Sequence, residues 1–133
     1  MKIIISIILL INTISAYSGE KAKDSKKKMS GNPIFEGWYA DPEAIIYGNK
    51  YWIFPTFSAP YEQQVKFDAF SSKDLVNWTK HERIIDTAEV RWAKKAMWAP
   101  GVIEKDGSYF FFFAANDVHE GEIGGIGVAR ANK

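Results

Sequence analysis

One acidic residue, Asp41, is the first candidate for chemistry because it lies among aromatic residues, in the run Gly37 to Pro42 (Gly-Trp-Tyr-Ala-Asp-Pro), just ahead of an apolar stretch. A carboxylate at such a place can take a proton from water, which is the work of a general base. Pro42 restricts the residue before it, so we expect Asp41 in an extended conformation at the entrance to a strand. These features alone leave a catalytic role and a turn-forming role open.

Five further residues are candidates for contacts to a bound ligand, such as a sugar. Indole and phenol rings stack on sugar rings, and amide or carboxyl groups hydrogen-bond to hydroxyls. The candidates are Trp38, Tyr39, Trp98, Asn116 and Asp117. Each has a structural alternative: the three aromatic residues can pack in a core, and the Asn-Asp pair can form a turn.

Other kinds of chemistry lack the residues that they need. The chain of 133 residues has no cysteine, which excludes disulfides and thiolate sites. Its two histidines, His81 and His119, have no nearby ligand set, so we expect neither a metal site nor a cofactor. The glycines from Gly124 to Gly127 lack the strand and helix context of a nucleotide-binding loop.

Two predicted hairpins hold most of the aromatic residues and provide the frame for these candidates. Residues 44–47 and 50–54 flank a Gly-Asn turn, and residues 102–103 and 109–113 flank a turn with Asp106-Gly107. The second strand of each hairpin is apolar at every position, which predicts that both of its faces are covered.

The two hairpins are related by a repeat of 58 residues. Pro42 aligns with Pro100, Ile45 with Ile103, Tyr51 with Tyr109 and Phe54 with Phe112. Carried forward, the same offset aligns residues 67–72 with residues 125–130. A long repeat of short strands is typical of β-propeller blades. At the position of Asp41, the second copy has Ala99, which favours a particular role for the acid over a general role in the turn.

The repeat predicts an all-β fold, a β-propeller of which only about the first two blades are present. The first blade is expected to have strands near 44–47, 50–54, 66–72 and 79–85. The second begins near Gly101 and reaches its third strand by Lys133. Because propellers close with at least four blades, the chain is expected to be the N-terminal part of a longer protein.

The residues before this body have the features of an exported protein. Residues 1–18 combine a basic start, a short apolar run and small residues, as a signal peptide does, and residues 19–31 form a flexible Lys-rich leader. Residues 32–133 form the incomplete propeller domain. We therefore expect a secreted or periplasmic protein without stable membrane insertion, since the apolar run is too short to span a bilayer.

The charge of the body excludes one class of partner. From Met29 onward the chain has 11 basic and 14 acidic residues, a balance that offers no electrostatic footprint for nucleic acid. By contrast, 19 of the 20 Phe, Trp and Tyr residues follow Met29. This aromatic density favours a β-rich, aromatic-lined protein, of a kind that can stack on sugars.

Four motifs, in order, resemble those of glycoside hydrolase family 43. They are Asn32-Pro-Ile34, Trp38-Tyr-Ala-Asp-Pro42, Ser72-Lys-Asp-Leu-Val-Asn-Trp78 and Met97-Trp-Ala-Pro100, the last followed by a strand rich in Tyr and Phe. The resemblance extends from about Asn32 to Arg130. It implies a five-bladed propeller that hydrolyses α-L-arabinofuranosides and β-xylosides with inversion, using an Asp base, an Asp that tunes a pKa and a Glu acid.

Of these three carboxylates, the resemblance assigns one to this chain, the base at Asp41. The tuning Asp and the acid Glu are expected beyond Lys133, so none of Glu104, Glu120 and Glu122 is assigned the acid role. One departure is Gly101, where the family usually has an acid after Trp-Ala-Pro. It is consistent with a subgroup that has a different subsite.

The sequence thus leads to a main hypothesis and two alternatives. The first is an arabinofuranosidase or xylosidase that acts on arabinose- or xylose-containing substrates with Asp41 as base. The second is a propeller that binds carbohydrate without catalysis. The third is a truncated product with no activity of its own, since an open propeller exposes strand edges and apolar faces.

Overall fold

The computed structural model describes residues 28–116 and 123–132. The predicted signal peptide and most of the predicted Lys-rich leader lie outside the described residues. So do Asp117, one of the candidate sugar contacts, and His119, Glu120 and Glu122. The described part consists of seven β-strands and one short 3-10 helix, η1 (Tyr61–Gln63), which confirms the all-β prediction.

Four antiparallel strands form the first sheet in the order in which they occur in the chain. They are β1 (Tyr39–Tyr47), β2 (Lys50–Phe57), β3 (Lys66–Ser72) and β4 (Trp78–Asp86). The strand β1 begins five residues before the predicted start at Ala44, because a β-bulge between Ala40 and Glu43 lets pairing with β2 continue past Pro42. Asp41 therefore lies within a strand and not ahead of one.

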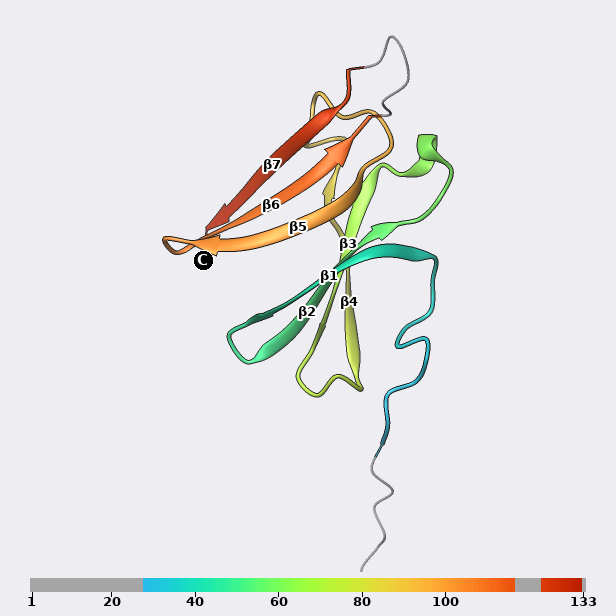
Figure 1. Cartoon of the computed structure of the whole chain (residues 1–133), viewed down its shortest axis with the longest axis vertical. Coiled ribbons are helices and arrows are strands. Elements are labelled where there is room, and N and C mark those ends of the chain that lie inside the picture. The colour runs from blue at the N-terminus through green and yellow to red at the C-terminus, as the bar shows by residue number, and fades with distance from the viewer. Residues whose placement is uncertain (1–27, 117–122, 133) are drawn as a thin grey trace, which may run out of the picture.

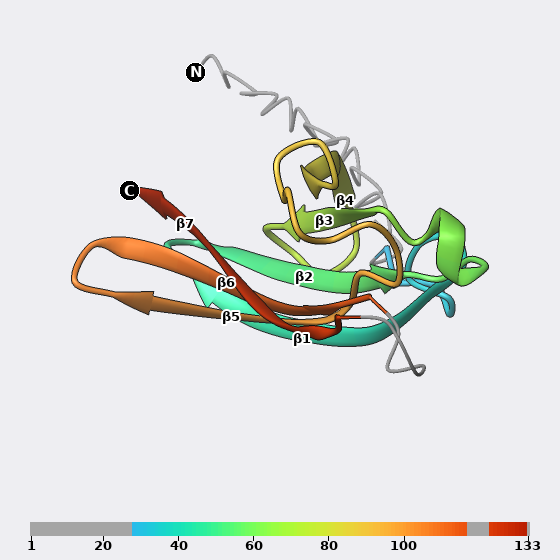
Figure 2. The ribbon, with the colours of Figure 1, turned by 90° about the horizontal axis from the view of Figure 1, so that it is seen from above.

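Three antiparallel strands form the second sheet, again in chain order. They are β5 (Trp98–Lys105), β6 (Ser108–Ala115) and β7 (Gly125–Asn132). A second bulge lies between Trp98 and Gly101. The strand β5 contacts both β1 and β2, and the two ribbon views agree that it runs beside them (Figure 1 and Figure 2).

The register of the strands confirms the 58-residue repeat in the hairpins. Ile45 pairs with Trp52 as Ile103 pairs with Phe110, and Glu43 pairs with Phe54 as Gly101 pairs with Phe112.

The third strand departs from the predicted alignment by one residue. Tyr51 pairs with Ser72, whereas Tyr109 pairs with Ala131, so residues 67–72 correspond to residues 126–131. A shift of one residue exchanges the two faces of a strand. The corrected alignment places Phe67 and Ile126 on equivalent faces, and it makes Gly127 the counterpart of Asp68.

The hydrophobic core lies between the two sheets. Phe67 of the first sheet is fully buried, and its ring centroid lies 5.0 Å from that of Phe111 and 5.5 Å from that of Phe113. Met97 and Ala93, from the segment between β4 and β5, complete the buried cluster. Burial of aromatic surface on this scale is the main force that holds one sheet on the other.

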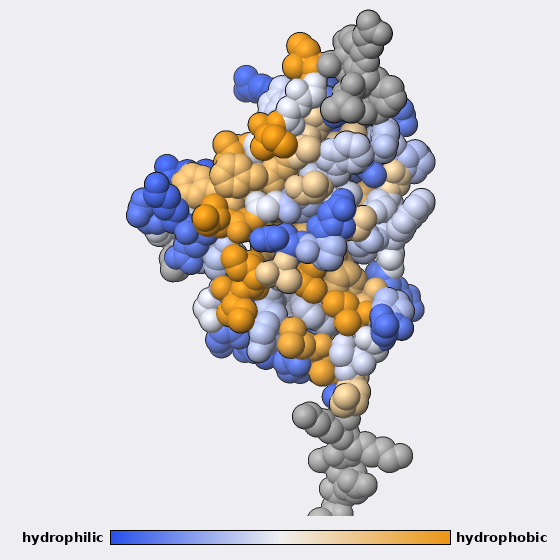
Figure 3. All heavy atoms as spheres, in the orientation of Figure 1, coloured by the Kyte–Doolittle hydropathy of each residue, from blue (hydrophilic) through white to orange (hydrophobic). Residues whose placement is uncertain are grey.

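One face of the second sheet stays open in this chain. Four large apolar side chains there are 42 to 75% exposed: Ile103, Phe112, Ile126 and Val128. By contrast, Phe67 and Ala69, the counterparts of residues 126 and 128 in the first sheet, are fully buried. Hydrophobic side chains are visible over both sheets in Figure 3. The prediction that both faces of residues 51–54 and 109–113 are covered is therefore wrong for Phe112, because the described residues include no third sheet to cover that face.

In the described part of the chain, no helix has the length and apolar character needed to cross a membrane.

Candidate active site

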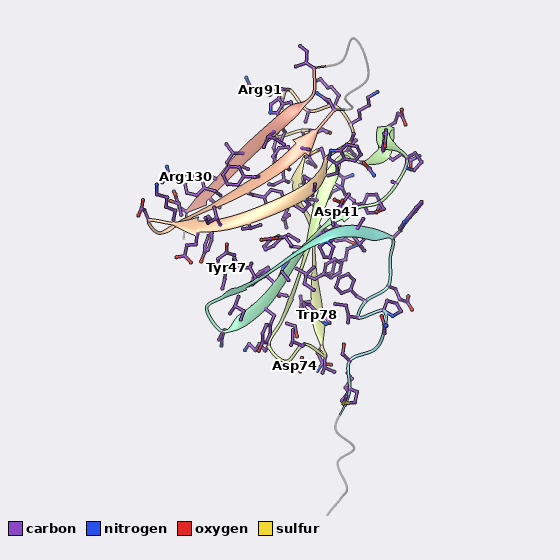
Figure 4. All side chains as sticks on the ribbon, viewed as in Figure 1. Asp41, Tyr47, Asp74, Trp78, Arg91 and Arg130 are labelled. Carbon is purple, nitrogen blue, oxygen red and sulfur yellow. The ribbon has the colours of Figure 1, made fainter. Side chains whose placement is uncertain are left out.

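Asp41 has an unusual backbone conformation, with φ at 47°, in the bulge between Ala40 and Glu43. The left-handed region costs a residue other than glycine roughly 1–2 kcal/mol. The expected extended conformation is therefore wrong. The bulge overrides the preference set by Pro42, since the extra residue must turn out of the ladder to let pairing resume at Glu43. As a result, the carboxylate is exposed to solvent, beside β5 (Figure 4).

Ala99 occupies the same position in the second sheet. It lies in the bulge between Trp98 and Gly101, has φ at 48°, and is followed by Pro100 as Asp41 is by Pro42. The backbone geometry therefore belongs to the repeat and needs no acid. Strained residues of this kind persist where the surrounding structure fixes them, and they cluster at functional sites.

Thr56 joins the two bulges. Its Oγ1 donates a hydrogen bond of 2.9 Å to Oδ2 of Asp41 and accepts one of 2.8 Å from the backbone N–H of Ala99. The residue is 2% exposed. Thr56 is not among the residues predicted from sequence, although a signal existed: the residue 58 positions later is Ala114, so the hydroxyl and the acid are both absent from the second copy.

Trp38 and Trp98 lie next to the two bulges in the chain. Trp38 precedes β1 and is 72% exposed, while Trp98 is partly buried, with its ring centroid 5.2 Å from that of Tyr61 in an edge contact. The helix η1 and its flanks are tied to this end of β5, because the backbone N–H of Ala96 donates to the carbonyl of Tyr61. The structure thus brings aromatic rings from both sheets to the end where Asp41 lies.

Tyr39 is turned away into the first sheet. Its hydroxyl donates a hydrogen bond of 3.0 Å to Asp68, and its ring packs edge-on against Phe70 at 5.2 Å. Burial, followed by the hydrogen bond to Asp68, raises the pKa of the Tyr39 hydroxyl. These contacts match the structural alternative for Tyr39.

Asp68 is a fully buried carboxylate with several partners, and it too is not among the residues predicted from sequence. It accepts from Tyr39 and from the backbone N–H of Arg83 at 2.9 Å, and it lies 3.4 Å from the ammonium groups of Lys66 and Lys80. Burial acts to raise the pKa of Asp68, but these donors and cations outweigh it and hold that pKa below its usual value. The group stabilises the sheet and is closed to a substrate.

The side chain of Asn116 is engaged by the loops around it. Its Oδ1 accepts from the backbone N–H of Lys94 at 2.8 Å, and its Nδ2 donates to the carbonyls of Trp92 and Ile123 at 3.0 and 2.8 Å. Asn116 therefore has a structural role, but these bonds join loops distant in sequence and are not those of the local turn that the sequence left open.

The Ser72–Trp78 motif forms a self-contained turn. Asp74 accepts hydrogen bonds from the backbone N–H and side-chain amide of Asn77, from the backbone N–H of Val76 and from the hydroxyl of Ser72, and these donors lower its pKa far below the usual range. The turn lies at the end of the first sheet away from Asp41 (Figure 4). Asp74 is thus a structural part of the motif.

A cavity of about 580 Å³ between the sheets is remote from the candidate base. It is lined mainly by apolar side chains, among them Trp52, Phe54 and Phe111, and by Tyr47 at the far end of β1. Among the described residues, no group of three His, Cys, Asp or Glu side chains is arranged to hold a metal ion. The chemistry available at the site is that of the Asp41 carboxylate, which can accept a proton and cannot also supply the acid.

The family model of glycosyl hydrolases family 43 matches residues 30–133. A β-D-galactofuranosidase from Aspergillus niger is 42% identical over 120 residues, which cover 83% of this chain and 34% of the relative. A xylosidase/arabinosidase from Humicola insolens is 30% identical over 117 residues, which cover 76% of this chain and 35% of that protein. The chain therefore spans about a third of the length of the curated relatives it matches.

Solved structures show the same architecture. A family 43 β-xylosidase/α-arabinofuranosidase from a compost microbial metagenome, in complex with xylotriose, matches with a TM-score of 0.60 and 26% identity, over 72% of this chain and 32% of that one. An enzyme from Xanthomonas citri complexed with xylose matches with a TM-score of 0.63 and 20% identity, over 72% of this chain and 29% of that one. These matches confirm the predicted propeller fold, of which the two sheets are blades.

Proposed function

Because the chain belongs to glycosyl hydrolase family 43, we propose that it is part of an enzyme that hydrolyses O-glycosidic bonds in arabinose- or xylose-containing polysaccharides or oligosaccharides. In this proposal Asp41 is the general base of an inverting reaction. The observation that supports it best is the exposed Asp41 carboxylate, held by Thr56 on a bulge whose copy in the second sheet has no acid.

The proposed reaction needs two carboxyl groups with opposite roles. Asp41 takes a proton from water while the water oxygen bonds to the anomeric carbon, and an acid gives a proton to the leaving oxygen as the glycosidic bond breaks. In inverting enzymes the two groups are roughly 6.5–9.5 Å apart, which leaves room for the water. We place the acid Glu and the Asp that tunes its pKa in the part of the enzyme beyond Lys133.

For the sugar contacts we propose Trp38 and Trp98. Trp38 exposes most of its ring, and Trp98 comes from the second sheet to the same end of the molecule. An indole face there can stack on the apolar face of a sugar ring. Asp117 stays a prediction outside the described residues. Tyr39 and Asn116 are weaker candidates, because their polar atoms already bond within the protein.

A second candidate substrate is a β-D-galactofuranoside. The relative that is 42% identical is named for this activity, whereas the relative that is 30% identical is named as a xylosidase/arabinosidase. All of these substrates are glycosides, so the roles of base and acid stay the same. The difference lies in the sugar that the site accepts, which a panel of substrates can decide.

The test is to express the longest reading frame that contains this chain and to assay 4-nitrophenyl α-L-arabinofuranoside, β-D-xyloside and β-D-galactofuranoside. We expect release of 4-nitrophenol from at least one of them, and Asp41→Asn is expected to lower kcat by about 10²- to 10⁴-fold. Asp106→Asn makes the same change in an exposed turn of the second sheet and should have little effect.

Two outcomes would contradict the proposal. Near-normal turnover by Asp41→Asn would remove Asp41 from the role of base. Binding of xylo- or arabino-oligosaccharides without release of reducing sugar would instead favour the non-catalytic alternative.

We also propose that residues 1–18 direct export of the protein, which suits an enzyme that acts on polysaccharides. The support is the order of a basic start, an apolar run and small residues. N-terminal sequencing of the protein recovered outside the cytoplasm checks this proposal. A retained Met1 in that material would contradict cleavage.

A further inference from the structure

The hydroxyl of Thr56 is the one hydrogen-bond partner of the Asp41 carboxylate in residues 28–116 and 123–132. Thr56 lies near the end of β2, opposite Ala40 in β1 and opposite Phe67 in β3. Both flanking strands and the second sheet enclose it, which is why so little of the residue is exposed. Its side chain is therefore held in one place, while the carboxylate that it contacts is open to solvent.

The direction of both hydrogen bonds is fixed by chemistry. A backbone N–H can only donate, so the Thr56 oxygen is the acceptor toward Ala99. A hydroxyl has one proton, and the 2.9 Å contact directs that proton to Oδ2 of Asp41. Asp41 is thus an acceptor at Oδ2, and its other oxygen, Oδ1, is left to take a proton from water.

The second sheet serves as an internal comparison. Ala114 lies opposite Trp98 just as Thr56 lies opposite Ala40, and the Ala99 bulge has nearly the same φ as Asp41 although its own second strand has no hydroxyl at this position. Forming the bulge therefore requires no acid, while the N–H of the Ala99 bulge is bonded to the Thr56 hydroxyl of the first sheet. The hydroxyl and the acid occur together in the first copy, and the matching positions of the second copy have Ala114 and Ala99. The Thr56 hydroxyl thus has two partners, the acid of its own sheet and the N–H of the second bulge.

We propose that Thr56 is a positioning residue for the general base: it fixes the Asp41 carboxylate through Oδ2 and ties that carboxylate to the second sheet through the N–H of Ala99. This inference rests on the proposed function. Because one hydroxyl makes both bonds, the orientation of the base depends on how the second sheet docks on the first. The sheet that lacks the acid thereby contributes to the site.

The experiment compares Thr56→Val and Thr56→Ser in the full-length enzyme, using the substrate that the unmodified enzyme hydrolyses best. Val keeps the branched shape and removes the hydroxyl, so kcat is expected to fall about 10- to 100-fold, the effect of losing a hydrogen bond to a charged group. KM should change by less than about threefold, since Thr56 is buried away from the sugar. Ser restores the hydroxyl and should restore kcat to within about threefold.

Controls separate positioning from stability. Thr79→Val makes the same change at an exposed position on β4 and should leave kcat unchanged. All assays are run well below the thermal midpoint of each variant, so that a purely structural role of Thr56 would alter the midpoint and not kcat. If Thr56→Val does not fold, Thr56→Ala, which copies Ala114 of the second sheet, is measured in the same way.

Each result decides the proposal. A kcat for Thr56→Val equal to that of the unmodified enzyme, or a loss that Ser fails to restore, overturns it while leaving Asp41 as base. If the Asp41→Asn variant is as active as the unmodified enzyme, Asp41 is not the general base. The proposed role of Thr56 is then overturned as well, because it depends on that of Asp41. No release of sugar by the unmodified enzyme from any substrate has the same consequence.

Discussion

Asp41 and Ala99 occupy one backbone position in two sheets, with φ angles of 47° and 48°. Asp41 is an acid whose carboxylate accepts a hydrogen bond from Thr56 of its own sheet, whereas Ala99 has no acid and the residue of its sheet that matches Thr56 is Ala114. The strained bulge is thus part of the architecture of each blade. The difference between the sheets lies in the side chains: in the first sheet the bulge position has a carboxylate, which we propose as the base, and a neighbouring strand supplies the hydroxyl that holds it.

The same two sheets differ in what covers them. Phe54 and Phe67 of the first sheet pack on Phe111 of the second. Their counterparts in the second sheet are Phe112, which is 42% exposed, and Ile126, which is 75% exposed. Equivalent side chains therefore contribute to stability in one copy and not in the other. Burial depends on the neighbour that a blade meets, and not on the residue itself.

The largest expected effect comes from making the first sheet chemically like the second. Asp41→Ala in the full-length enzyme should lower kcat by about 10²- to 10⁴-fold, with the fold retained, because Ala99 already tolerates the same backbone conformation. The double variant Asp41→Ala with Ala99→Asp should not regain the lost activity, since its carboxylate projects from a different sheet and Ala114 offers no hydroxyl to hold it. Substrate turnover and circular dichroism check both statements, and recovery of activity by the double variant would contradict the comparison.

The next effect concerns the covered and open faces. Phe67→Ala should lower the free energy of unfolding of this 133-residue chain by about 3–5 kcal/mol, since it opens a cavity between the sheets. Phe112→Ala makes the same change on the open face and should cost less than about 1 kcal/mol. Urea denaturation of the two variants measures both. Equal losses would show that the open face is covered in solution.

Acid should weaken the first sheet through Asp68, whose counterpart in the second sheet is Gly127. The pKa of Asp68 is lowered on folding. Its contribution to the free energy of unfolding is therefore complete above the unfolded pKa of about 3.9, and it is lost as the pH falls through the lower pKa of the folded state. Asp68→Asn should lower the free energy of unfolding by about 2–3 kcal/mol at pH 7 and reduce the difference between pH 7 and pH 3. Denaturation at the two pH values checks this. An unchanged pH dependence in the variant would assign the acid sensitivity to other groups.

The smallest expected effect tests where the two sheets are alike. Gly48 and Gly107 lie in the hairpin turns at φ of 61° and 73°, and at both positions the space that a Cβ would enter is open, with no neighbouring side chain or strand within 4 Å. Gly48→Ala and Gly107→Ala should each cost about 1 kcal/mol from backbone strain alone. Thermal denaturation compares them, and a much larger loss at one turn would show that the hairpins are not equivalent.

Much of the frame could be predicted from sequence because its signals are local. The Gly-Asn and Asp-Gly turns between apolar strands, the 58-residue repeat and the proline after each bulge position depend on neighbouring residues, and they indicated the hairpins and their register. The same signals indicated Asp41 as the candidate base. Its role itself stays a prediction.

Several features depended on contacts between distant residues. The left-handed backbone of Asp41, the one-residue shift in the third strand, and the engagement of Tyr39 and Asn116 all arise from strand pairing and packing. None of them leaves a signal in adjacent residues, because each is selected by what the folded neighbours allow.

By itself, then, the sequence determined the class of fold, the family and the position of the candidate acid, since turns, periodicity and motifs are properties of short stretches. The tertiary structure alone decided that Thr56, 15 residues after Asp41, reaches the N–H of Ala99 a further 43 residues on. That bond forms only when the two apolar sheets bury their shared face, which brings both bulges to the same hydroxyl.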